Sequence, residues 1–218
     1  MESYKSEFIR FIMETGALQF GEFTTKSGRK SPYFINTGKF RTGSQIGRLG
    51  EFYAACIMEH MAAGRIPTDI GSLFGPAYKG IPIAVSTTIA LAGIYGRNLG
   101  YCFDRKEAKD HGDSGSLVGH IPADGEKVLL VEDVITAGTA VRTVLPLLAE
   151  VSDATVAGLV ISVDRMEKGT GERSATQELL DDLGIPTFSI VTVEEILPWI
   201  EPEHRQAMEA YMDRYCVR

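Results

Sequence analysis

The sequence contains few cysteines, and those present do not suggest cross-links. Cys56, Cys102 and Cys216 are the only three, and no pair of them forms a CxxC motif. An odd number of isolated cysteines is typical of reduced thiols and disfavours a disulfide framework. We therefore expect a cytoplasmic protein without a structural metal.

Long apolar runs are also missing, and no segment is long and apolar enough to span a membrane. The first 20 residues carry charges of both signs, and Tyr4, Phe8, Phe11 and Ile12 among them repeat at helical spacing. This pattern predicts an amphipathic helix in place of a signal peptide. We expect no association with a membrane.

Positive charge is scarce, because 22 lysines and arginines face 29 acidic residues and give a net charge of −7. This balance disfavours general affinity for nucleic acid, so any phosphate site must be local. With 44% hydrophobic residues and only 9 prolines, the chain can bury a sizeable core and does not resemble a disordered protein. We expect one domain covering residues 1–218.

Strand and helix patterns alternate along most of the chain. Helical spacing predicts a helix from about 44 to 63, and apolar runs without period-two alternation, such as 127–131, predict strands covered on both faces. The fold class is therefore α/β, with a mostly parallel central sheet flanked by helices. The remaining expected strands are 69–74, 99–103, 155–163 and 187–191, and the remaining helices are 83–94, 139–150 and 174–183, with a capping box at 192–195 before a last helical region.

Residues 104–119 interrupt this alternation. The segment is rich in charge, glycine and serine, and it has no apolar period. Long loops within a compact domain are uncommon and are often lids or binding elements. We expect a mobile loop here.

The most informative motif is residues 128–140, an apolar strand that ends in Glu132 and Asp133 and turns into a helix. Small residues at Ala137 and Gly138 let backbone N–H groups approach a phosphate, and the helix N-terminus favours negative charge. The two acids are placed to accept hydrogen bonds from sugar hydroxyls. The alternative is a buried strand with an ordinary turn and two capping acids.

Other phosphate-binding motifs are missing. No GxxxxGK[ST] loop occurs, and the glycine pair around Thr170 has Ser174 where a dinucleotide fingerprint needs glycine. We interpret Gly169 to Gly171 as a surface loop.

Four further segments, 20–34, 74–82, 105–112 and 162–165, narrow the identification. Together with 128–140 they resemble the bacterial orotate phosphoribosyltransferases of the type I phosphoribosyltransferase family, over nearly the whole chain. The resemblance implies transfer of the phosphoribosyl group of 5-phosphoribosyl 1-pyrophosphate to orotate, in pyrimidine biosynthesis. It also implies an N-terminal hood formed by residues 1–40 with the C-terminal segment, a magnesium cofactor without a dedicated protein metal site, and a homodimer that shares loop 104–119.

The resemblance assigns site residues. Its implied catalytic residues are Lys106, Lys109, His111 and Asp133. Its implied ligands of phosphoribosyl pyrophosphate are Lys26, Tyr78, Lys79, Arg105, Lys106, Lys109, His111, Glu132, Asp133, Val134, Ile135, Thr136, Ala137, Gly138, Thr139 and Ala140. Its implied ligands of orotate are Lys26, Phe34, Ile35, Thr136 and Arg165.

Two departures and three alternatives accompany the resemblance. Many relatives have aspartate where this chain has Glu132, and an aromatic residue where it has Ile35. Arg165 is alternatively a strand-end arginine paired with Asp164 or Glu167. The chain as a whole is alternatively a transferase for another base or a noncatalytic sensor of the same donor, although an intact cationic loop disfavours the sensor.

Overall fold

Six strands form the central sheet of the computed structural model, which describes residues 3–217 apart from 26–27, 107–115, 136–137 and 170. The strand order is β5-β4-β3-β6-β7-β8, and every neighbouring pair is parallel except β4 and β5. The expected mostly parallel sheet is confirmed. The strands are β3 (Ile70–Phe74), β4 (Gly100–Asp104), β5 (Leu117–Gly119), β6 (Lys127–Glu132), β7 (Thr155–Asp164) and β8 (Thr187–Thr192).

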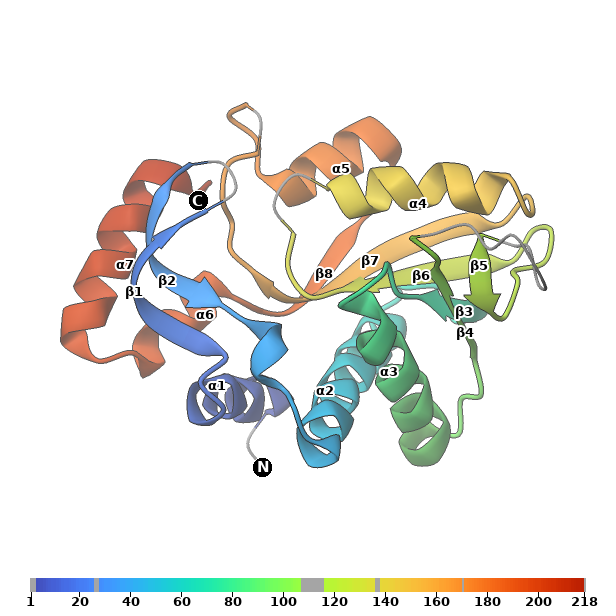
Figure 1. Cartoon of the computed structure of the whole chain (residues 1–218), viewed down its shortest axis with the longest axis horizontal. Helices are drawn as coiled ribbons and strands as arrows, with labels where there is room; N and C mark the ends of the chain where they lie inside the picture. The colour runs from blue at the N-terminus through green and yellow to red at the C-terminus, as the bar shows by residue number, and fades with distance from the viewer. Residues whose placement is uncertain (1–2, 26–27, 107–115, 136–137, 170, 218) are drawn as a thin grey trace.

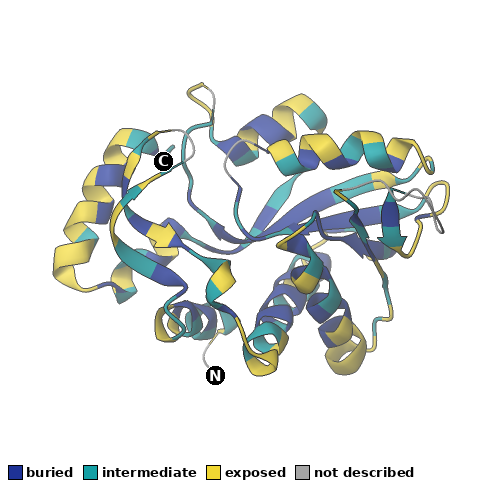
Figure 2. Ribbon diagram, in the orientation of Figure 1, coloured by how far each residue is buried: buried dark blue, intermediate teal, exposed yellow. Residues whose placement is uncertain are grey.

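Helices cover both faces of this sheet (Figure 1), with α2 (Gly43–Ala62) and α3 (Gly80–Tyr95) on one face and α4 (Thr139–Ala149) and α5 (Ala175–Leu183) on the other. Neighbouring residues of β6 therefore contribute to different cores. Leu129 and Val131 pack with α2 and α3, whereas Val128 and Leu130 pack with α4 and α5. This explains why the strand is apolar at every position from 128 to 131, and Figure 2 shows the strands buried between helices with exposed outer faces.

Local sequence signals set several element boundaries. α2 begins at a capping box in which Thr42 and Gln45 exchange hydrogen bonds, and the predicted box at Thr192 and Glu195 is also formed. It precedes α6 (Val193–Ile196) and a 3₁₀ turn at Leu197–Trp199. A second 3₁₀ turn, Thr37–Lys39, leads into α2.

The two ends of the chain meet at one side of the sheet. A hairpin of β1 (Leu18–Thr24) and β2 (Lys30–Ile35) lies beside α7 (Pro202–Tyr215) in Figure 1, and we call these three elements the hood. The helix predicted over the first 20 residues is too long, because α1 (Tyr4–Glu14) stops before Gly16, whose φ of 68° is left-handed. β1 starts two residues later.

The predicted loop 104–119 is also too long at its C-terminal end. Residues 117–119 form β5, which pairs antiparallel with β4, and the N–H of Arg105 donates to the carbonyl of Ser116 at 2.9 Å. A three-residue edge strand has too little pattern to be found from sequence. Residues 107–115 lie outside the described part of the chain.

Two sequence expectations concern the whole chain. Cys56, Cys102 and Cys216 are buried and free. Within the residues that the structure describes, every helix is too short or too polar to cross a membrane.

We predict that Gly50→Ala destabilises the fold by about 1–3 kcal/mol, because overpacking a tight helix contact forces the backbones apart. A Cβ at Gly50 of α2 would lie 2.5 Å from the carbonyl carbon of Ser86 in α3. Gly47→Ala in the same helix is the control, since a Cβ there has no atom within 4 Å among the described residues. Urea unfolding measures both variants, and equal stability of the two would contradict the tight contact.

Candidate active site

The parallel strands bring functional side chains to one edge of the sheet. Lys79 follows β3, Asp104 ends β4, Asp133 follows β6 and Arg165 follows β7. In open α/β sheets, ligands bind outside the carboxyl ends of the strands. The sequence motifs therefore converge on one place although they are up to 86 residues apart, the separation between 79 and 165.

Asp133 is the central acid of this site and is buried. Its Oδ2 accepts hydrogen bonds from Nζ of Lys79 at 2.6 Å and from the hydroxyl of Thr37 at 3.0 Å, and its Oδ1 accepts from the N–H of Val134 at 2.8 Å. The carboxylate thus links β6 to the loop after β3 and to the segment after β2. Thr37 was not identified from the sequence, because a lone threonine before a helix carries no motif.

Two hydroxyl groups beneath the acid pair fix its backbone. The phenol of Tyr53 in α2 donates to the carbonyl of Glu132 at 2.6 Å, and the hydroxyl of Ser162 donates to the carbonyl of Asp133 at 2.5 Å. Both side chains are buried, so these donors hold the backbone in one position. Ser162 lies within a segment that carries the family resemblance, whereas Tyr53 lies within the helix predicted from about 44 to 63 and belongs to no motif.

The two acids have opposite pKa shifts. Burial and the neighbouring Asp133 carboxylate raise the pKa of Glu132 to about 8. Burial alone would also raise the pKa of Asp133, but the hydrogen bond and charge of Lys79 outweigh it and lower that pKa. Glu132 therefore carries a proton in most molecules at pH 7, while Asp133 is ionised.

The turn after the acids leads into α4. Ile135 is buried, and Gly138 caps the helix with a left-handed φ of 66°. The left-handed φ favours glycine here, and a Cβ at Gly138 would also lie 2.7 Å from a methyl group of Leu179, which would have to shift. Of the other predicted residues, Thr139 and Ala140 begin the helix, whereas Thr136 and Ala137 lie outside the described residues.

The predicted cationic residues are only partly described. Lys79 is half-exposed at the start of α3, and Tyr78 beside it is exposed. Arg105 and Lys106 follow β4, and Nζ of Lys106 pairs with Oδ2 of Asp104 at 2.8 Å. Lys26, Lys109 and His111 lie outside the described residues.

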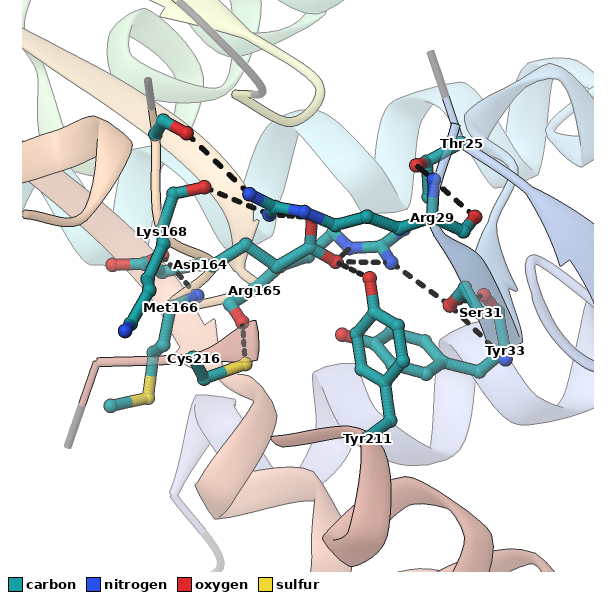
Figure 3. Close-up of polar contacts among 12 residues, drawn as sticks. Thr25, Arg29, Ser31, Tyr33, Asp164, Arg165, Met166, Lys168, Tyr211 and Cys216 are labelled. Carbon is teal, nitrogen blue, oxygen red and sulfur yellow. Dashed lines mark hydrogen bonds and ion pairs between the residues drawn. The ribbon is translucent and has the colours of Figure 1, made fainter. Parts of the chain in front are cut away.

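Arg165 is buried in a polar cluster between β7 and the hood (Figure 3). Its Nε donates to Oε1 of Glu167 at 2.8 Å, its Nη2 donates to the hydroxyl of Ser31 at 3.1 Å, and its guanidinium lies 4.5 Å above the ring of Tyr33. The phenol of Tyr211 in α7 also donates to Glu167 at 2.8 Å. The pairing with Glu167 considered from the sequence is thus present, and it fixes the orientation of the arginine at the strand end.

The hood residues Phe34 and Ile35 differ in exposure. The ring of Phe34 is 37% exposed and stacks on Phe23 with centroids 5.5 Å apart, whereas Ile35 is buried in the core. Side chains alternate along a strand, so only one of the two faces outward. Only the backbone of Ile35 therefore remains for contact with a ligand, and its predicted role stays a prediction.

We predict that Glu132→Gln raises the free energy of unfolding relative to the parent, and that this gain is about 1–3 kcal/mol larger at pH 8.5 than at pH 5. The pKa of Glu132 rises from 4.5 to about 8 on folding, so its stabilising contribution is complete below pH 4.5 and is lost as the pH rises toward 8. Glutamine stays neutral and avoids this loss. Urea unfolding at both pH values tests this, with the exposed Glu209→Gln as control, and a pH-independent difference between the variant and the parent would contradict it.

Comparisons with known proteins show which family the chain resembles in sequence and fold. The phosphoribosyl transferase domain family matches residues 42–192, which contain the sheet and the acid pair. The orotate phosphoribosyltransferase of Bifidobacterium adolescentis is 51% identical and that of Pseudomonas fluorescens strain SBW25 is 49% identical, with at least 98% of each chain covered. A crystal structure of the Francisella tularensis orotate phosphoribosyltransferase has a TM-score of 0.83 at 37% identity, covering 100% of this chain and 99% of that one. The chain therefore belongs to the orotate phosphoribosyltransferases, within the phosphoribosyl transferase domain family.

Proposed function

We propose that the chain transfers the phosphoribosyl group of 5-phosphoribosyl 1-pyrophosphate to orotate, forming orotidine 5′-monophosphate and pyrophosphate for pyrimidine biosynthesis. One observation carries this proposal. A buried arginine, Arg165, directly follows β7, and the buried acid Asp133 directly follows the neighbouring strand β6. A cation for an anionic base therefore lies beside an acid suited to ribose hydroxyls.

The donor half of the site, which binds 5-phosphoribosyl 1-pyrophosphate, is formed by residues at the ends of β3 and β6 and at the start of α4. Asp133 accepts from Lys79, and both groups can exchange this contact for the hydroxyls and the pyrophosphate of the donor. The N-terminus of α4 after Gly138 supplies N–H groups for the 5′-phosphate. We assign Glu132, Val134, Ile135, Thr139 and Ala140 to the same half, together with the residues 136 and 137.

The acceptor half lies between β7 and the hood. Orotate is a planar anion, so it needs a cation for its carboxylate and an apolar surface for its ring. Arg165 supplies the cation, and the partly exposed Phe34 supplies the surface. The hood lies outside the family-wide match to residues 42–192, but the full-length orotate phosphoribosyltransferases align over it. This supports a hood that contributes to base recognition and belongs to the same functional domain.

The reaction breaks the bond between the anomeric carbon and the pyrophosphate oxygen while a ring nitrogen of orotate bonds to that carbon and loses its proton. The transition state places positive charge on the ribose and negative charge on the pyrophosphate. Asp133 stabilises the ribose side, and Lys79 and Lys106 stabilise the leaving group. We assign Lys26, Lys109, His111, Tyr78 and Arg105 to the donor phosphates as well.

Magnesium fits this site as an ion held mainly by substrate oxygens. Among the described residues, no three histidine, cysteine, aspartate or glutamate side chains cluster as metal ligands, and the oxygens of Asp133 already accept hydrogen bonds from Lys79, Thr37 and Val134. Magnesium commonly binds through phosphates, waters and one or two carboxylates. When bound, it would neutralise charge on the leaving pyrophosphate.

A phosphoribosyltransferase for another base would keep the donor half and change the acceptor half. We predict that the parent consumes orotate but not uracil, adenine or hypoxanthine in the presence of the donor and magnesium.

Arg165→Lys should raise the KM for orotate by about tenfold or more, because lysine cannot reproduce the planar, bidentate contact of arginine. The KM for the donor should change little. Ultraviolet absorbance follows each base.

Arg173→Gln is the control, because Arg173 is an exposed residue just before α5 that pairs with Asp181 and Asp182. Consumption of another base by the parent would reject the orotate site and retain the donor site. Tight donor binding without turnover of any base would favour a noncatalytic sensor.

We also propose a cytoplasmic location, in keeping with three unpaired cysteines.

We further propose a homodimer in which the two subunits share loop 104–119. A groove of about 710 Å³ lies between α2 and α3, and it is lined mainly by apolar side chains. Ile89 and Ile94 in α3 are 67% and 57% exposed. A second copy of this chain can bury this surface by contacting the same surface around a two-fold axis.

Ile89→Asp is predicted to raise the dissociation constant of the dimer by about tenfold or more, because it buries a charge at the centre of the interface. Leu180→Asp on α5 is the matched control, since Leu180 is also exposed but lies on the opposite face of the sheet. Sedimentation equilibrium distinguishes the outcomes. A parent protein that remains monomeric would reject the interface.

A further inference from the structure

Asp104 is a buried acid to which the reaction outlined above gives no role. It is the last residue of β4 and is 3% exposed. Its two carboxylate oxygens have different partners, because Oδ1 accepts from the N–H of Ala77 at 2.6 Å and Oδ2 pairs with Nζ of Lys106 at 2.8 Å. A buried carboxylate is retained when such partners offset the loss of hydration.

The first partner belongs to the loop between β3 and α3. This loop, residues 75–79, ends at Lys79, which contacts Asp133. Its start is fixed by the N–H of Gly75, which donates to the carbonyl of Cys102 at 2.9 Å. A Cβ at Gly75 would lie 2.1 Å from the carbonyl oxygen of Gly80, so the loop closes tightly on itself. Asp104 therefore holds the middle of the loop, and β4 provides the rigid support.

The second partner is the cation assigned to the pyrophosphate. The side chain of Lys106 is 41% exposed while that of Asp104 is 3% exposed, so the ammonium lies between the buried acid and solvent. An ammonium group that touches this acid cannot make its full set of contacts with an incoming anion. The negative charge of Asp104 also opposes a polyanion nearby.

We propose that Asp104 is a positioning residue for the pyrophosphate group of the donor. Its Oδ1 holds loop 75–79 in place, and its Oδ2 competes with pyrophosphate for Lys106. The inference rests on the proposed function, which makes Lys106 a ligand of the pyrophosphate. Asp104 thus orders the binding loop and at the same time limits the affinity for the donor.

Two substitutions separate these roles. Asp104→Asn keeps an oxygen acceptor for the N–H of Ala77 but removes the charge that holds Lys106. Asp104→Ala removes both. We measure the dissociation constant of 5-phosphoribosyl 1-pyrophosphate with magnesium by calorimetric titration, and the KM for orotate as a readout that should not change in Asp104→Asn.

We expect Asp104→Asn to bind the donor about fivefold more tightly than the parent, the size of one partly exposed ion pair. Asp104→Ala should bind the donor about fivefold more weakly than Asp104→Asn. Alanine, unlike asparagine, cannot accept the hydrogen bond from Ala77 and therefore releases loop 75–79. In Asp104→Asn combined with Lys106→Ala, the tighter binding should disappear relative to Lys106→Ala alone.

Unchanged or weaker binding by Asp104→Asn would overturn the competition for Lys106. Equal binding by the asparagine and alanine variants would overturn the loop-holding role. These failures differ from failure of the proposed function, in which the parent itself would not consume orotate.

Discussion

The buried carboxylate of Asp133 joins parts of the chain that are far apart in sequence. Lys79 reaches it from the loop after β3, Thr37 from the turn after the hood hairpin, and Ser162 holds its carbonyl from β7. The charge is retained because Lys79 and several hydrogen-bond donors compensate its burial. This constraint fixes the spacing between the sheet, the α3 loop and the hood, and hence the geometry of the candidate site.

Local concentration of positive charge is the second organising feature. The chain has a net charge of −7, yet Lys79, Lys106 and Arg165 gather around strand ends that also carry acids. Each of these three cations has an acidic partner, which is Asp133 for Lys79, Asp104 for Lys106 and Glu167 for Arg165. The protein thus keeps its cations oriented by ion pairs, and we infer that substrate anions compete for them. Such pairing also explains how an acidic protein can contain a site for polyanions.

Prediction from the sequence succeeded where one local pattern determines the structure. The apolar run before Glu132 gave the strand, Gly138 gave the turn, and the capping box at Thr192 gave a helix start. It failed where structure depends on distant partners. β5 forms only because β4 lies beside it, and Thr37 joins the site only because the hood brings it to the sheet.

The sequence by itself determined the α/β class, the family resemblance and the acid pair at the end of β6, because apolar periodicity and an ordered motif are local properties of the chain. The tertiary structure decided which charges meet. It brought Arg165 into contact with Glu167 and Ser31, and it gave the carboxylate of Asp104 two partners. It also raised the pKa of Glu132 and lowered the pKa of Asp133. Burial and contact between distant segments set these properties, and no single segment of the sequence contains them.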